Sequence, residues 1–230
     1  MPPEGSSLRS WWPTTQSLDL VYGDIKSVAA ALEVEFSRFA QPAKIQTSWR
    51  RFGNLGAAFK SASTFDNVVT HVVALPTHSD WVVLWNNSFL CSGYDSLCWC
   101  LTTHHKLRTL HWSAHDEWTT FQSGASFTHR QFDGANVVER SVSSIQEDKR
   151  WIFHESGPLL PEEDSADYTA RKRRDRLNEK TLTALLGRLG AEPWSDAFYD
   201  LEGKDAFVLS RPVPPKAISR TADQVIRVPA

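Results

Sequence analysis

The sequence predicts an α+β domain with a mostly antiparallel sheet flanked by helices. Three observations predict it: a helical apolar period near the start of the chain, short β-branched and alternating runs in the middle, and helical spacing again in the last third. Blocks of strands and blocks of helices, rather than regular alternation, are typical of this class. We expect a single domain at residues 17–210, between a flexible segment at 1–16 and an extended tail at 211–230.

The first predicted element is an amphipathic helix. Its apolar face consists of Val21, Ile25, Val28, Leu32, Phe36 and Phe39. These residues recur every three or four positions, as one face of a helix does. Ser17 and Asp19 are its candidate caps. Glu33, Glu35 and Arg38 lie off the apolar face.

A second, weaker helical period follows at Ile45–Lys60. The pattern then changes, because Asn67–Leu75 is rich in β-branched residues and Trp81–Trp85 is continuously apolar. The turn-forming residues 76–80 separate these two runs, so we expect a β-hairpin buried on both faces. Asp95 is then positioned to begin a helix.

The middle of the chain predicts an antiparallel meander. From Leu110 to His154, short alternating runs are separated by Gly, Asn, Asp and Lys. The region Ser165–Leu189 returns to helical spacing and is expected to break near Asn178. A short helix from Pro193 and a last edge strand at Ala206–Ser210 complete the predicted domain.

The charge balance argues against a polyanionic partner. Lys and Arg total 25 and Asp and Glu total 27, which gives a formal net charge of -2. Such a chain has no strong field with which to attract nucleic acid. The basic run at Arg171–Arg176 is therefore interpreted as a solvated helix face, with a phosphate-binding site as the weaker alternative.

The compartment is predicted to be the cytoplasm. The first residues lack the apolar run of a secretory signal peptide, and no stretch approaches the ~20 apolar residues of a membrane helix. The cysteines Cys91, Cys98 and Cys100 are an odd set of 3 placed close together, which favours reduced thiols.

The histidine-rich segment His104–Asp116 is the best candidate for metal chemistry. On a strand, His111 and His115 would share a face but stand ~13 Å apart, too far for one ion. His104 and His105 are adjacent and are expected to point apart. Together with the absence of hydrolase, nucleotide-binding and metalloprotease motifs, this predicts no catalytic residues, no metal and no cofactor.

Tryptophan is the unusual feature of the composition. The chain has 10 Trp in 230 residues, against roughly 1–2% in average proteins. Some of them are therefore expected to be exposed anchors of a protein interface, with Trp118 the best candidate. The predicted partner-binding residues are Trp118, Asp116, Glu117, His115, Tyr94 and Asp95.

Three runs carry a family resemblance at the level of organisation. WVVLWNNSFLCSGYDSLCWCLT, LHWSAHDEWTTFQSG and RWIFHESGPLLPEED resemble the layout of immunity proteins from bacterial polymorphic, type VI or contact-dependent toxin systems. The resemblance spans roughly Asn67–Trp194 and implies a non-catalytic cytoplasmic protein that binds its cognate toxin and occludes the active site. Many inhibitors of nuclease toxins are strongly acidic, and the net charge of -2 departs from that pattern, so other toxin chemistries are left open.

Two other functions stay open on sequence grounds. One is a metal-assisted hydrolase that uses the His104–Asp116 segment. The other is nucleic-acid binding through Arg171–Arg174, which would weaken steeply with salt. The leading hypothesis is the toxin inhibitor, because it accounts for the missing catalytic motifs and the excess of tryptophan together.

Overall fold

The computed structural model of the protein describes residues 7–11, 14–39, 44–90, 94–115 and 123–226. The strands are β1 (Ser17–Tyr22), β2 (Gln46–Arg50), β3 (Phe65–Asp66), β4 (His71–Pro76), β5 (Trp81–Asn86), β6 (Thr109–His115), β7 (Gly124–Phe132), β8 (Val137–Glu147), β9 (Arg150–Ser156), β10 (Ala206–Ser210) and β11 (Ser219–Arg220). The α-helices are α1 (Ser7–Ser10), α2 (Ile25–Phe39), α3 (Leu55–Phe59), α4 (Asp95–His105), α5 (Arg173–Arg176), α6 (Glu179–Arg188) and α7 (Ala222–Val225). The 3-10 helices include η2 (Ser165–Thr169) and η3 (Asp196–Phe198).

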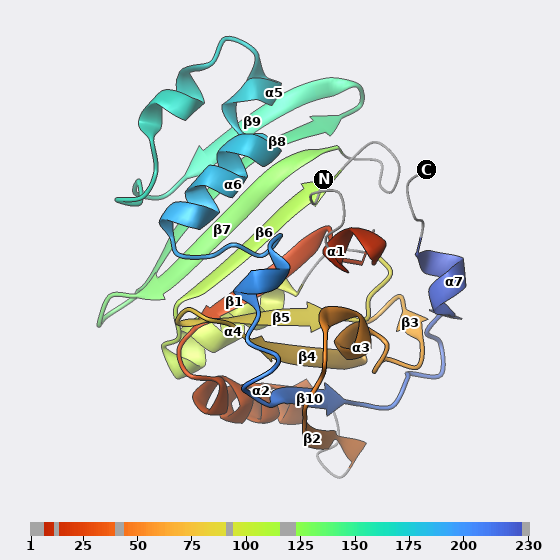
Figure 1. The fold of residues 1–230 in the computed structure, drawn as a ribbon. Coiled ribbons are helices and arrows are strands. Elements are labelled where there is room, and N and C mark those ends of the chain that lie inside the picture. The colour runs from red at the N-terminus through yellow and green to blue at the C-terminus, as the bar shows by residue number, and fades with distance from the viewer. Residues whose placement is uncertain (1–6, 12–13, 40–43, 91–93, 116–122, 227–230) are drawn as a thin grey trace.

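One large antiparallel sheet organises the molecule. Within the described ranges it has nine strands in the order β2-β10-β4-β5-β1-β6-β7-β8-β9 (Figure 1). β11 and β3 form a separate two-stranded pair. The predicted α+β class with a mostly antiparallel sheet is confirmed, as are the β4–β5 hairpin and the β6–β9 meander.

Helices cover both faces of the sheet. α2 and α4 pack on one face, where Leu32, Phe36 and Leu101 are buried. On the other face α6 lies against β7 (Figure 1). There α3 contributes Phe59 to the larger core. Strand β5 therefore alternates between two apolar environments, which explains why its sequence is continuously apolar. None of the described helices has the length and apolar character needed to cross a bilayer.

The predicted first helix begins later than expected. Val21 lies in β1, which pairs with both β5 and β6 and is buried between them except at Tyr22. Asp19 is likewise a strand residue and not a cap. The cap of α2 is Asp24, whose Oδ1 accepts hydrogen bonds from the backbone N–H groups of Lys26 and Ser27, each at 3.0 Å.

The second predicted helix, Ile45–Lys60, is also corrected. Its first half is strand β2, which pairs with β10, and only its end is helical, as α3 with Asn54 as N-cap. The same pairing corrects the expectation for Ala206–Ser210. That strand is internal, because β2 covers one edge and β4 the other.

The ends of the domain contribute to the core. Leu8 in α1 is fully buried, and Trp11 packs edge-on against Phe59. At the other end, β11 pairs with β3 and Val225 is buried. The packed unit therefore extends beyond residues 17–210 on both sides. The break predicted near Asn178 is confirmed, since Asn178 caps α6 with a capping box.

The turn after β9 depends on a glycine. Gly157 has φ +81°, and a Cβ there would lie 1.9 Å from the carbonyl oxygen of Glu139. Gly157→Ala should therefore lower the free energy of unfolding by at least about 2 kcal/mol, through backbone strain and a steric clash. Denaturant unfolding measures this directly.

The control for that variant is Gly187→Ala in α6, where a Cβ would meet nothing within 4 Å. Alanine favours a helix, so Gly187→Ala should stabilise the protein by about 0.5–1 kcal/mol. Equal stability of the two alanine variants would contradict the close approach of β8 to the turn at Gly157.

Candidate binding surface

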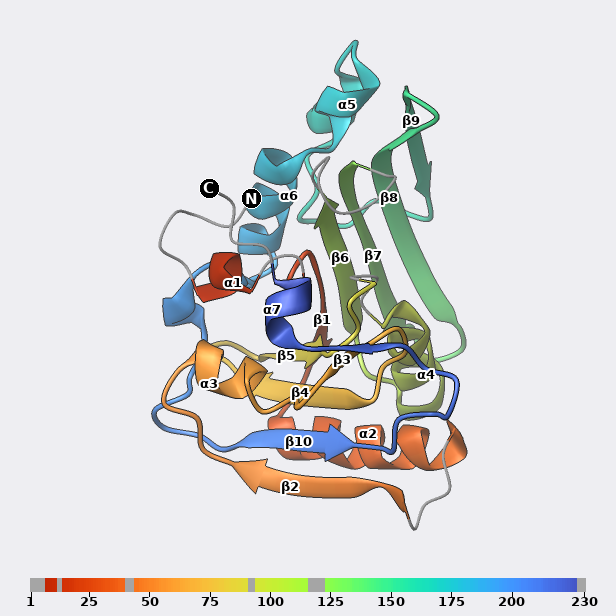
Figure 2. The same ribbon diagram turned by 90° about the vertical axis from the view of Figure 1, so that its right-hand side faces the viewer.

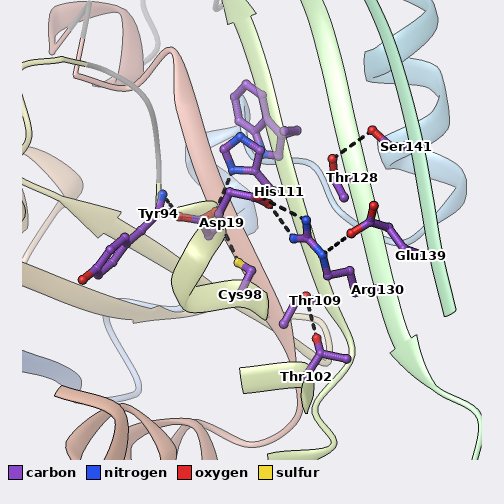
Figure 3. A network of polar contacts seen from close by, with 12 residues as sticks. Asp19, Tyr94, Cys98, Thr102, Thr109, His111, Thr128, Arg130, Glu139 and Ser141 are labelled. Carbon is purple, nitrogen blue, oxygen red and sulfur yellow. Dashed lines mark hydrogen bonds and ion pairs between the residues drawn. The ribbon is translucent and has the colours of Figure 1, made fainter. Parts of the chain in front are cut away.

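A buried carboxylate joins the start of α4 to the sheet. Asp19 on β1 is 1% exposed and lies at the centre of the contacts in Figure 3. The backbone N–H of Tyr94 donates to its Oδ2 at 2.8 Å, and the Cys98 thiol donates to its Oδ1 at 3.3 Å. His111 Nδ1, on the neighbouring strand β6, lies 2.8 Å from the same Oδ1. The Asp19 carboxylate is therefore satisfied by one neighbouring strand, β6, and by the start of helix α4.

Arg130 provides a second connection between α4 and the sheet. Its guanidinium binds both oxygens of Asp95, in the first turn of α4, at 2.5 and 3.0 Å. Its Nε donates to Glu139, the residue directly opposite on β8, at 2.6 Å. Burial would raise the pKa of Asp95, but the hydrogen bonds from Arg130 outweigh this, so that pKa is lowered. A bidentate pair of this kind fixes orientation as well as distance.

The Asp19 carboxylate shifts the pKa values of two neighbouring side chains, His111 and Cys98. Burial disfavours a charged His111, but the hydrogen bond and charge of Asp19 prevail and raise the pKa of His111. Burial and the Asp19 carboxylate raise the pKa of the Cys98 thiol well above its ordinary value. Cys98 is fully buried and remains a neutral thiol, which makes it a structural hydrogen-bond donor and not a nucleophile.

One face of the β6–β9 region is polar. Residues paired across an antiparallel sheet share a face, and alternate residues along a strand return to it. The face that carries His111 also carries Ser113, Ser126, Thr128, Ser141, Ser143, His154 and Ser156, which we call the polar face. α6 contacts the opposite side of these strands, and α4 lies near one end of the polar face (Figures 1 and 2).

The hydroxyl groups of the polar face bond across strands. Ser113 Oγ lies 2.6 Å from Ser126 Oγ. Thr128 Oγ1 lies 3.2 Å from Ser141 Oγ, as Figure 3 shows. Each hydroxyl keeps further donor or acceptor capacity beyond this one bond. Ser113 is buried, whereas Ser126, Thr128 and Ser141 are partly exposed and can hydrogen-bond to a donor or an acceptor of a partner.

Trp99 stands beside the polar face. It is 47% exposed on α4, and the Arg130 guanidinium lies 5.7 Å from its ring centroid. Its neighbours Cys98 and Asp95 are the residues that fix α4 to the sheet. The indole is thus a large exposed aromatic on a well-anchored helix, a combination that favours an interface anchor.

The structure describes part of the predicted partner-binding set. Tyr94 and Asp95 are partly buried and belong to the connections between α4 and the sheet. Trp118, Asp116 and Glu117 lie outside the described residues, and of His115 the structure describes only the backbone, at the end of β6.

Sequence reasoning missed four residues of this region. Asp19 was assigned to a helix cap, and Arg130 and Trp99 drew no functional interpretation. Glu35 was expected off the buried face of its helix, yet it is fully buried under α4. The signals were weak, because the pairing of distant segments and not local spacing brings these side chains together.

His104 and His105 do not diverge as expected. Both rings reach one oxygen of Glu35 on α2, since His104 Nδ1 lies 3.0 Å and His105 Nε2 lies 2.7 Å from Oε1. Both histidines lie in the last turn of α4. Their rings turn toward the same carboxylate, that of Glu35, because it lies between α2 and α4.

A separate hollow of about 460 Å³ lies near the η3 segment. Two of the acidic residues that line it are engaged: Asp196 accepts hydrogen bonds from the N–H and Oγ of Ser7, and Asp200 pairs with Lys204 at 3.2 Å. These contacts account for both carboxylates as structural groups. The hollow therefore offers less to a functional argument than the polar face and Trp99.

Comparison with known proteins identifies no relative. No protein-family model, curated protein or solved structure matches this chain.

The buried histidines should titrate in opposite directions. His111 should titrate above its ordinary value of ~6.5, whereas burial, assisted by a nearby arginine in each case, lowers the pKa of His71 and of His129 to about 4. NMR titration of the imidazole resonances measures all three values.

The raised pKa of His111 has a definite consequence for stability. Its contribution is complete below the unfolded pKa of ~6.5 and is lost as pH rises through the folded pKa. The difference in unfolding free energy between the wild type and His111→Gln should therefore be larger at pH 5.5 than at pH 8.5. A difference that grows with pH, or a His111 pKa below 6.5, would show that Asp19 does not stabilise the imidazolium.

Proposed function

We propose that this chain is a non-catalytic binding protein that neutralises a cognate bacterial protein toxin by occluding its active site. The surface that binds the toxin is the polar face together with Trp99. The observation that carries the proposal is the 47% exposure of Trp99, held beside Arg130 on the anchored helix α4. The toxin as partner class derives from the resemblance in organisation to immunity proteins.

Trp99 suits the role of a central anchor. Tryptophan and arginine are enriched among the residues that dominate binding energy at interfaces. An anchor that is already fixed in the free protein loses little conformational entropy on binding. The contacts of Asp19 and Arg130 with α4 supply that fixation, so the indole is presented in a restricted position.

The polar face suits the periphery of such an interface. Hydroxyl groups from neighbouring strands provide adaptable donors and acceptors around the aromatic anchor. At the far end of the face, the cross-strand pair Ile145 and Ile152 adds apolar surface, and Ile152 is 38% exposed. The surface therefore combines an exposed aromatic side chain, the hydroxyl groups of the polar face, and apolar side chains at its far end.

The electrostatics suit a partner that is not strongly basic. Near the anchor, the single positive charge of Arg130 is paired with two carboxylates, Asp95 and Glu139, so only a small negative excess is left. With the formal net charge of -2, this leaves shape and hydrogen bonding to provide specificity. A toxin that acts on proteins, lipids or small molecules fits this surface better than a strongly basic nuclease does.

The experiment captures the partner and measures its function. The tagged chain is expressed in its native cells, and polypeptides retained after a stringent wash are identified by mass spectrometry. The retained polypeptide should arrest growth when it is expressed alone and should lose this effect when the chain is co-expressed. Trp99→Ala should weaken its binding by about 30-fold or more, the loss expected at an interface hot spot. Trp118→Ala should also weaken binding without unfolding the domain.

The matched control is Trp49→Ala. Trp49 is 46% exposed, nearly the same as Trp99, but lies on β2 at the other end of the sheet. Its substitution should change binding less than about twofold, as expected outside an interface hot spot. A chain that retains no polypeptide, or whose partner binds Trp99→Ala as tightly as the wild type, would contradict the proposal. Hydrolytic activity that requires a metal would then favour the enzyme hypothesis.

A further inference from the structure

A second cluster of polar groups lies between α2 and α4, away from the polar face. At its centre is Glu35, whose side chain is 0% exposed. Its Oε1 contacts both His104 and His105, and Arg38 Nη1 lies 3.4 Å from the same oxygen. Its Oε2 is buried and has no hydrogen-bond partner among the described residues. A buried carboxylate oxygen without a hydrogen bond is costly, so a cation that binds this oxygen would stabilise the fold.

Two further donor groups lie beside this carboxylate. Cys100 and His104 are four residues apart on α4 and therefore share one face of the helix. One ligand atom from each of Glu35, Cys100 and His104 lies within 4.8 Å of the others. Ligands bound to one zinc ion at 2.0–2.3 Å stand roughly 3.3–3.8 Å apart, so a contraction of about 1 Å would bring these three atoms to a single ion.

We propose that Glu35, Cys100 and His104 bind one zinc ion that joins α2 to α4. Thiolate sulfur, imidazole nitrogen and carboxylate oxygen are the three donor types that zinc accepts in proteins. Magnesium and calcium require oxygen ligands, so the sulfur and nitrogen donors select against them. His105, already 2.7 Å from Glu35 Oε1, is positioned to orient the carboxylate or to supply the fourth ligand.

Arg38 lies beside two of the proposed ligands, His104 and Glu35. Its Nη1 lies 2.5 Å from His104 Nδ1, and its side chain is 48% exposed. Because it is half exposed, the guanidinium can turn outward into solvent at little cost. Zinc would replace its positive charge beside Glu35 and would also satisfy Oε2. Arg38 is thus a competitor of the metal and not a ligand.

Binding requires a proton to leave Cys100. The thiol loses its proton to solvent when the sulfur binds zinc, and His104 must be neutral. Zinc affinity should therefore fall as pH is lowered. The ion would fix α4 near Trp99, the residue that precedes Cys100.

The test uses the full chain, treated with a chelator and kept reduced. Zn²⁺ affinity is measured by competition with a chromophoric chelator, and Co²⁺ serves as a spectroscopic probe. We expect one ion per chain, a zinc-dependent rise in Tm, and a thiolate-to-cobalt charge-transfer band. Cys100→Ser should abolish that band. Cys100→Ser and Glu35→Gln should each lower Zn²⁺ affinity by more than the 10–100-fold typical of residues that only orient a ligand.

Two further variants separate a metal site from an ion-pair cluster. His104→Gln alters a side chain that is 39% exposed, so the fold should persist, as circular dichroism would verify, while zinc affinity is lost. Arg38→Ala should bind zinc at least as tightly as the wild type. His78→Ala is the matched control, because His78 is exposed and lies far from the cluster in a contact with Asp200. No zinc-dependent Tm shift in the wild type, or unchanged affinity in folded Cys100→Ser and His104→Gln, would overturn the proposal.

Discussion

The rest of the site depends on one constraint, which is that the buried Asp19 carboxylate must receive hydrogen bonds from the protein. A carboxylate that is 1% exposed is stable only where hydrogen bonds or an opposite charge replace its water. Asp19 obtains these from the Tyr94 backbone, the Cys98 thiol and the His111 imidazole. The start of α4 is thereby fixed against β1 and β6.

The position of α4 determines both proposed sites. One side of the helix presents Trp99 beside Arg130 and the polar face. Another side brings Cys100 and His104 to Glu35 on α2. A partner that binds at Trp99 and an ion that binds at Glu35 would both stabilise the same orientation of this helix. The two proposals are nevertheless independent, because they depend on different side chains.

Local sequence patterns were sufficient for elements whose periodicity is unambiguous. The β4–β5 hairpin, α4, the β6–β9 meander and the break at Asn178 all follow from spacing and turn residues. Val21 was assigned to the helix because it lies four residues before Ile25 and so fits the apolar period of α2. In the structure, Gly23 and the cap residue Asp24 separate β1 from the helix. β10 was taken for an edge strand because its pairing with β2 joins distant segments.

The functional residues were harder to predict, for a related reason. A single-face pattern places Glu35 at the surface, but α4 covers a second side of α2 and buries it. Cys100 and His104 have helical ligand spacing, yet the third donor comes from a segment distant in sequence. Trp99 could not be distinguished from the other tryptophans, since exposure depends on tertiary packing.

Amide hydrogen exchange in Asp19→Asn tests the role of Asp19 most directly. The account predicts that the amides of Tyr94 and α4 exchange faster than in the wild type by about 100-fold or more, as loss of a buried charged contact of roughly 3 kcal/mol implies. The amides of β4 and β5 should exchange faster only to the extent that the global free energy of unfolding is lowered. Unchanged protection of α4, or equal loss throughout the sheet, would show that α4 is held by apolar packing and not by Asp19.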